Sequence, residues 1–147
     1  MKDERPLIGD ARLVGLYDYW LAKAGARAMP ARGDIDPVEM KPWLGNLVLV
    51  EFLGGLENYR VRLEGVNIEA MYRGSRAGRG IEALTSKDER DLLLRQYGAV
   101  LENRRPAYYE ADFQASEGVF ARQNKLLLPL SNDGEHVNMI LAGIYFR

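Results

Sequence analysis

The sequence predicts an α+β fold, in which a five-stranded antiparallel sheet carries helices on one face and an extra helix precedes it. Segments with helical periodicity separate two blocks of strand-like alternation. The first block contains two strands and the second contains three, each joined to the next by residues typical of tight turns. Because tight turns join antiparallel neighbours, we expect both blocks to share one sheet.

Length and composition narrow the possible functions. The chain has 147 residues, a formal net charge of -1, one histidine and no cysteine. This length is typical of one domain. The absence of cysteine excludes disulfides, thiolate metal sites and cysteine nucleophiles, and a single histidine excludes a multi-histidine metal site. The near-neutral charge disfavours a nucleic-acid partner, so we expect a protein partner or a second copy, most simply in a homodimer.

No segment predicts a membrane location. The N-terminus is charged, and no apolar run approaches the length of a membrane-spanning helix. We therefore expect a cytoplasmic protein. We expect residues 1–9 to be flexible and residues 10–147 to form one domain, made of an N-terminal helix over 10–25 and a core over 46–147.

The first element is an amphipathic helix between Asp10 and Gly25. Asp10 is suited to the N-cap and Gly25 to the position after the last turn. Its apolar residues follow helical spacing: Leu13, Leu16, Tyr17, Trp20, Leu21 and Ala24. Large aromatic side chains must be covered, either by the domain's own sheet or by a second copy. We predict a homodimer interface formed by Leu13, Tyr17, Trp20 and Leu21.

A connector rich in proline and aspartate follows. Asp36 is suited to the N-cap of a short helix, with Pro37 in its first turn and an end near residues 44–45. Arg32, Asp34 and Asp36 form the polar cluster of this segment. We expect a structural role, with Arg32 paired to Asp34 or another nearby carboxylate. Recognition of an anionic ligand or a partner is the alternative.

The remaining elements follow in order. A hairpin is expected from strands at 47–53 and 59–64, followed by short helical pieces over 66–84. A longer helix should begin at Thr85 or Ser86 and end before Pro106. Three strands then follow at 109–114, 119–130 and 136–146, separated by turns at 116–118 and 132–134. Pro129 should lie at the end of its strand, because it lacks a backbone N–H.

The order of elements, together with several short motifs, resembles a PAS-like family of alphaproteobacteria that was formerly catalogued as a domain of unknown function. The most specific motif is Pro-Ala-Arg-Gly-Asp-Ile-Asp-Pro at residues 30–37. Supporting motifs are Leu-x-x-Tyr-Trp at 16–20, Tyr-x-Val-Arg-Leu-x-Gly at 59–65 and Leu-Leu-Leu-Pro-Leu-Ser at 126–131. Val66 replaces the threonine usual in the family. The resemblance covers about residues 13–146 and implies a sensory or regulatory module.

The resemblance also suggests which cofactors to consider. A chromophore attached through cysteine is excluded, and haem is not expected, because the single histidine, His136, follows a turn. Non-covalent flavin is left open, although no phosphate-binding glycine loop follows a strand. A candidate pocket for a small ligand lies between the inner sheet face and the short helices. Its lining is predicted to be Tyr59, Val61, Leu63, Met71, Tyr72, Ala111 and Phe113, with plain core packing as the alternative.

We predict a cytoplasmic sensory or regulatory domain that acts through protein contacts, with or without a small ligand, and that carries no output domain of its own. The alternatives are a small-molecule binding protein without signalling output and, in third place, a cone-shaped hydratase or isomerase. We do not expect an enzyme, because the polar residues cluster at the connector and turns. A buried Glu110 or Asp112 would favour the enzymatic alternative.

Overall fold

Five antiparallel strands form one sheet in the computed structural model, which describes residues 5–72, 74–80, 87–116 and 119–147. The strands are β1 (Leu47–Phe52), β2 (Tyr59–Glu64), β3 (Ala107–Ser116), β4 (Val119–Leu130) and β5 (Met139–Phe146). Their spatial order is β2-β1-β5-β4-β3, so the first and last strands of the sequence pair at the centre of the sheet. The predicted fold class is confirmed.

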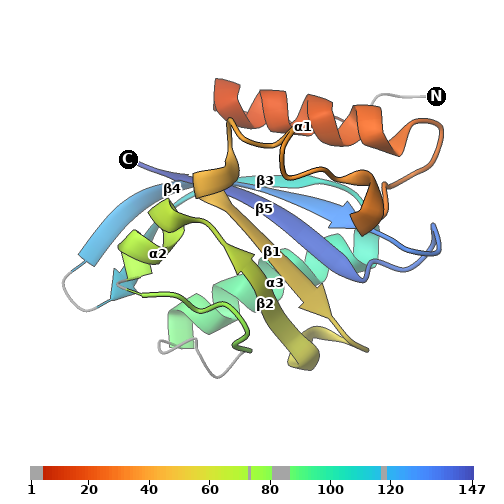
Figure 1. Ribbon diagram of the computed structural model, residues 1–147. Coiled ribbons are helices and arrows are strands. Elements are labelled where there is room, and N and C mark those ends of the chain that lie inside the picture. Colours follow the sequence, from red (N-terminus) through yellow and green to blue (C-terminus); the bar gives the residue numbers. More distant parts are fainter. Residues whose placement is uncertain (1–4, 73, 81–86, 117–118) are drawn as a thin grey trace.

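Helices cover both faces of the sheet. Helix α1 (Ala11–Ala24) lies on one face, here called the outer face, while α2 (Val66–Tyr72) and α3 (Lys87–Asn103) lie on the other, the inner face (Figure 1). Short 3-10 turns occur at Arg32–Asp34, Leu44–Asn46 and Leu56–Asn58.

Alternation along the strands builds a separate hydrophobic cluster on each face. In β1, Leu47 and Leu49 belong to the outer cluster, whereas Val48 and Val50 belong to the inner one. The strand is therefore apolar on both sides, which explains the continuous apolar run in its sequence. Burying each such side chain stabilises the fold by about 1.5–3 kcal/mol.

Helix α1 is fixed at both ends and in its middle. Asp10 Oδ1 accepts a hydrogen bond from the Arg12 N–H at 3.0 Å, and Gly25 has a φ of 60° after the last turn. Trp20 Nε1 donates to the Pro129 carbonyl of β4 at 2.8 Å. Gly143 in β5 allows the close approach, because a Cβ there would lie within 3 Å of the Leu13 and Leu16 side chains.

The structure differs from the predicted elements in two places. Residues 37–43 form consecutive turns and no regular helix, because Pro42 interrupts the backbone pattern, although Asp36 Oδ1 still accepts from the Val38 N–H at 2.9 Å. The last strand begins at Met139, because the Asp133 carboxylate holds the preceding loop through the N–H groups of Glu135 and His136. The expected helix start at Thr85 or Ser86, and residues 117–118 of the expected turn, lie outside the described residues.

Candidate functional site

The inner face carries most of the predicted pocket residues. Tyr59 and Val61 are buried in the inner cluster, and Tyr72 of α2 packs against its edge. Met71 and Ala111 are half-buried. Ala111 alternates with Ala107 and Tyr109, which pack against the inner cluster, and therefore faces inward with them. The side chain of Phe113 lies outside the described part of the chain. Tyr59, Val61 and Tyr72 therefore lie at the inner face, and their role in lining a ligand pocket stays a prediction.

Leu63 is a correction. It was predicted to point inward with Val61, but the pairing of β1 with β2 shifts by one residue between them, so that Leu63 pairs with Leu49 and Val61 with Val50. The bulge places Arg62 as the extra residue and moves Leu63 to the outer face, where its side chain is 50% exposed.

Aromatic rings fill the centre of the inner cluster. The rings of Tyr59 and Tyr97 meet edge to face at 6.2 Å between centroids, and Phe52 lies about equally close to both. Burial raises the pKa of the Tyr97 hydroxyl well above its ordinary value, so this group is neutral at physiological pH. Phe52 and Tyr97 were not predicted as neighbours of this region, although Leu93, Tyr97 and Val100 have the sequence spacing of one helix face.

Polar side chains are buried on the same face. Leu93, Gln96, Tyr97 and Val100 follow one another at helical spacing on the side of α3 that is buried. Gln96 is only 6% exposed, and its Oε1 has no hydrogen-bond partner among the described residues. Lys125 of β4 is equally buried, with its Nζ 5.8 Å from the centroid of the Tyr97 ring. No pattern in the sequence identified Gln96, which reads there as an ordinary helix residue.

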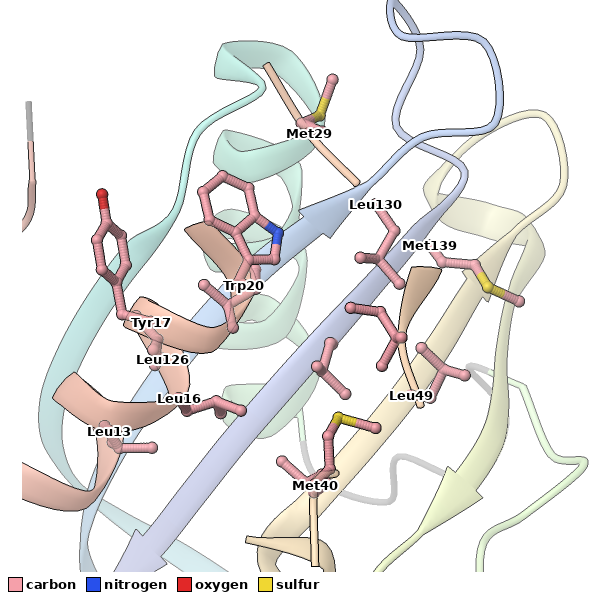
Figure 2. Packing of buried hydrophobic residues seen from close by; sticks show 14 of the residues in the cluster. Leu13, Leu16, Tyr17, Trp20, Met29, Met40, Leu49, Leu126, Leu130 and Met139 are labelled. Atoms are coloured by element: carbon pink, nitrogen blue, oxygen red, sulfur yellow. The ribbon is translucent and has the colours of Figure 1, made fainter. Parts of the chain in front are cut away.

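The outer face holds a cavity of about 490 Å³, here called the outer groove. It lies between the connector, with Ile35 and Met40, and the sheet, with Leu49 and Leu141; the displaced Leu63 lines its edge. Figure 2 shows Met40 and Leu49 on the sheet face that α1 also covers. The sequence gives little indication of this groove, because it depends on the bulge in β2 and on the path of the connector.

Two charged residues line the outer groove. The Glu64 side chain is fully buried and receives two hydrogen bonds from Arg76, from the backbone N–H at 2.8 Å and from Nε at 3.1 Å. Arg32 donates through one guanidinium nitrogen to the Ile35 carbonyl at 3.2 Å.

The connector cluster is built differently from the prediction. Asp34 pairs with Arg27 at 2.9 Å and accepts a hydrogen bond from the Ala31 N–H at 2.8 Å, so it is not the partner of Arg32. These contacts hold the pKa of the Asp34 carboxyl below its ordinary value. Asp36 has the expected capping contact with Val38. Arg32 thus has no ion-pair partner among the residues that the structure describes.

The predicted dimer surface is also a correction. Leu13, Tyr17 and Trp20 are at most 5% exposed, and they pack on the protein's own sheet beside Leu126 and Leu130 (Figure 2). Only Leu21 of the four predicted residues is exposed. The apolar stripe was correctly predicted to be buried. It is buried against β4 and β5 of the same chain, which was the alternative to burial against a second copy.

The remaining polar candidates lie away from the inner face. Asp112 is exposed and lies 3.4 Å from Arg122, while Glu110 accepts a hydrogen bond from the Tyr108 hydroxyl at 2.6 Å. His136 is exposed and contacts Asp133 at 2.8 Å. Within the described ranges, no cluster of acidic or histidine side chains could hold a metal ion, and no helix is long and apolar enough to cross a membrane.

Comparison with known proteins agrees with this topology. The sequence model of a family described as a PAS domain matches residues 10–145. No curated protein matches the sequence.

Solved structures share the fold at low sequence identity. A sensory box sensor histidine kinase from Vibrio cholerae has a TM-score of 0.54 at 18% identity, over 75% of this chain and 87% of that one. The PAS domain of the fruit-fly ELK potassium channel has a TM-score of 0.53 at 17% identity, over 74% and 91%. A Rhodobacter sphaeroides LOV protein has a TM-score of 0.53 at 16% identity, over 68% of this chain and 57% of that one.

Proposed function

The chain belongs to the PAS domain family, whose members are sensory and regulatory domains, and from that premise we propose that it receives a small polar molecule at the inner face. We further propose that it passes the signal on through contacts with another protein. No catalytic role is part of the proposal.

The observation that carries the proposal is the buried acceptor on Gln96. A buried polar atom without a partner costs about 1–3 kcal/mol, so such atoms are rare and call for an explanation. Gln96 Oε1 has no partner among the described residues, although its neighbours Leu93 and Val100 are well packed. A ligand that donates a hydrogen bond to this oxygen would remove the cost, and the bound state would gain stability over the free state.

The neighbouring groups indicate the chemistry of this ligand. The Lys125 ammonium lies on the same face of the sheet, and the hydroxyl of Tyr97 is neutral there. A molecule with a hydrogen-bond donor for Gln96 and an acceptor or acidic group for Lys125 suits this set. Because the chain has no cysteine, the molecule is not attached to the protein through a thiol.

A protein partner is the proposed output. The net charge of -1 gives no electrostatic basis for binding nucleic acid. Large apolar side chains are exposed between α1 and β1, at Val38 and Leu44. Two more are exposed at the end of the edge strand β2 and the start of α2, at Leu63 and Val66. Such surfaces are typical of protein contacts. If the chain forms a homodimer, its contact uses exposed residues of this kind and not the buried α1 stripe.

The ligand proposal is tested by replacing Gln96 with leucine, which keeps the approximate volume and removes the acceptor. We expect Gln96→Leu to leave the ligand-free protein as stable as the wild type or more stable, by up to about 1 kcal/mol. We also expect it to abolish the thermal shift that a screen of small polar metabolites produces in the wild type. Native mass spectrometry of both proteins identifies the bound mass.

Leu93→Met is the matched control, because it changes the same side of α3 without adding or removing a strong polar group. It should retain the thermal shift. If no metabolite stabilises the wild type, or if Gln96→Leu responds like the wild type, the inner face is not the ligand site.

A further inference from the structure

The outer groove has the dimensions of a ligand site, and it lies on the face of the sheet opposite to the inner face. Its volume of about 490 Å³ lies within the range of about 300–1,000 Å³ typical of small-molecule pockets. Its floor is the sheet, at Leu47, Leu49 and Leu141, and its wall is the connector, at Ile35 and Met40. The groove is bounded by two separate parts of the chain, and it is not a gap within a single loop.

The lining is apolar along nearly its whole length. Leucine, isoleucine, valine, proline and methionine provide the side chains other than those of Arg32 and Glu64, and backbone at Gly45 and Gly65 completes the surface. Such a lining favours a hydrocarbon chain, since each CH₂ group removed from water contributes about 0.8 kcal/mol. Met40 is suited to contact with chains of different length, because its side chain is unbranched and polarisable.

The charges of the groove favour an anionic group at one position. Glu64 is neutralised by Arg76. Close by in the connector, Asp34 and Glu39 are already paired with Arg27 and Lys23. Among the described residues, Arg32 therefore lines the groove without an ion-pair partner, and one hydrogen bond to the Ile35 carbonyl leaves most of its N–H groups available.

We propose that the outer groove binds a linear aliphatic carboxylate, a fatty acid, with its chain along the apolar lining and its carboxylate on Arg32. A single planar guanidinium matches a carboxylate in a two-bond contact. One guanidinium neutralises the single charge of a carboxylate, whereas a phosphate dianion carries a second charge that it leaves unpaired. This site is distinct from the inner face, so the proposal does not depend on the ligand proposed there.

The experiment uses decanoate as the probe and measures its affinity by calorimetry for the wild type and Arg32→Gln. We expect decanoate to bind the wild type at least about tenfold more tightly than Arg32→Gln, the size of one lost charge-assisted contact. Decan-1-ol, which has the chain without the charge, should bind both proteins equally. Chemical shifts of Ile35, Leu63 and Leu141 should change on binding, while those of Tyr97 and Val100 should not.

Two control variants complete the test. Lys41→Gln removes an exposed charge of the same connector and should retain the wild-type affinity, whereas Leu63→Asp places a negative charge at the groove and should weaken decanoate binding. The proposal is overturned if decanoate does not bind, or if Arg32→Gln binds it as well as the wild type does. It is also overturned if an acidic amphipathic peptide changes the chemical shifts of the groove residues and decanoate does not. Gln96→Leu should bind decanoate normally, so this site and the inner-face site can fail separately.

Discussion

Asp10 shows how one residue joins the first helix to the sheet. Its carboxylate accepts hydrogen bonds from the Arg12 backbone and side chain at 2.9–3.0 Å and from Asn124 of β4 at 3.2 Å. The Arg12 side chain, the Asn124 amide and the Arg12 backbone together lower the pKa of Asp10 from its ordinary value of 3.8 to about 2, against the opposing effect of burial. The sequence indicated the N-cap, while the contact with Asn124, 114 residues away, depends on the tertiary fold.

We expect Asp10→Ala to lower the free energy of unfolding by about 1–2 kcal/mol at pH 7, because the cap and the contacts of the carboxylate are lost together. The pKa of Asp10 is lower in the folded state than in the unfolded state. The stabilisation is therefore complete above about pH 4 and is lost as the pH falls toward 2. Urea unfolding of the wild type and the variant at several pH values measures this difference.

Asp18→Ala provides the control for that series. Asp18 lies on the same helix but is exposed, with a single ion pair to Arg5 at 3.3 Å. Its substitution should cost less than about 1 kcal/mol. A difference between wild type and Asp10→Ala that stayed constant from pH 7 to pH 2 would contradict the role given to the carboxylate.

Among the elements, α1 is attached to the sheet in its middle through Trp20. Its ring is 3% exposed, and its N–H meets the Pro129 carbonyl, which lies at the end of β4. Trp43 makes a similar bond of 2.8 Å to the Arg12 carbonyl, but its side chain is only half-buried. The two tryptophans therefore make the same kind of hydrogen bond, but the side chain of Trp20 is more deeply buried than that of Trp43.

We expect Trp20→Phe to lower the free energy of unfolding by about 2–3 kcal/mol, because it leaves a buried carbonyl unpaired and reduces the packed volume. Trp43→Phe should cost about 1 kcal/mol or less. Chemical denaturation followed by far-UV circular dichroism compares the two variants. Equal losses would mean that the burial of Trp20 does not determine how firmly α1 is held.

The elements also show where prediction from the sequence succeeds and where it ends. Helix α1 was predictable because its spacing and both end residues agree. What covers its apolar stripe was not, since burial against β4 and burial against a second copy require the same pattern. Leu63 was misplaced because alternation assumes an unbroken register, and the bulge at Arg62 leaves no signal in composition. Arg32 and Asp34 are close in sequence, yet Asp34 pairs with Arg27.

On the scale of the whole molecule, the two hydrophobic clusters share one sheet. In β5, Ile140 and Ala142 belong to the inner cluster while Leu141 belongs to the outer one. β1, β4 and β5 each contribute buried side chains to both clusters, so neither face can lose these strands while the other remains folded. The family and the grouping of two and three strands into one sheet were predictable on this scale, because they depend on many residues at once and tolerate single errors. The pairing of β1 with β5 was not predicted.

We therefore expect a single cooperative unfolding transition. In the Trp43→Phe variant, the fluorescence of Trp20 reports on the outer cluster, and methyl NMR signals of Ile68 and Val100 report on the inner one. Both should show the same urea midpoint. Two separated midpoints would show that α1 and its cluster unfold independently of the inner face.

The bulge in β2 has a consequence for association between molecules. β2 lies at one edge of the sheet, where a straight, regular strand could pair with an edge strand of another molecule and start aggregation. The shift of register at Arg62 interrupts the regular row of backbone groups at this edge. Beside it, the Val61 N–H is bonded to the Arg79 carbonyl at 2.9 Å, and the Val61 carbonyl accepts from Gly78 at 2.6 Å. The irregularity that directs Leu63 into the groove thus also protects this edge from intermolecular strand pairing.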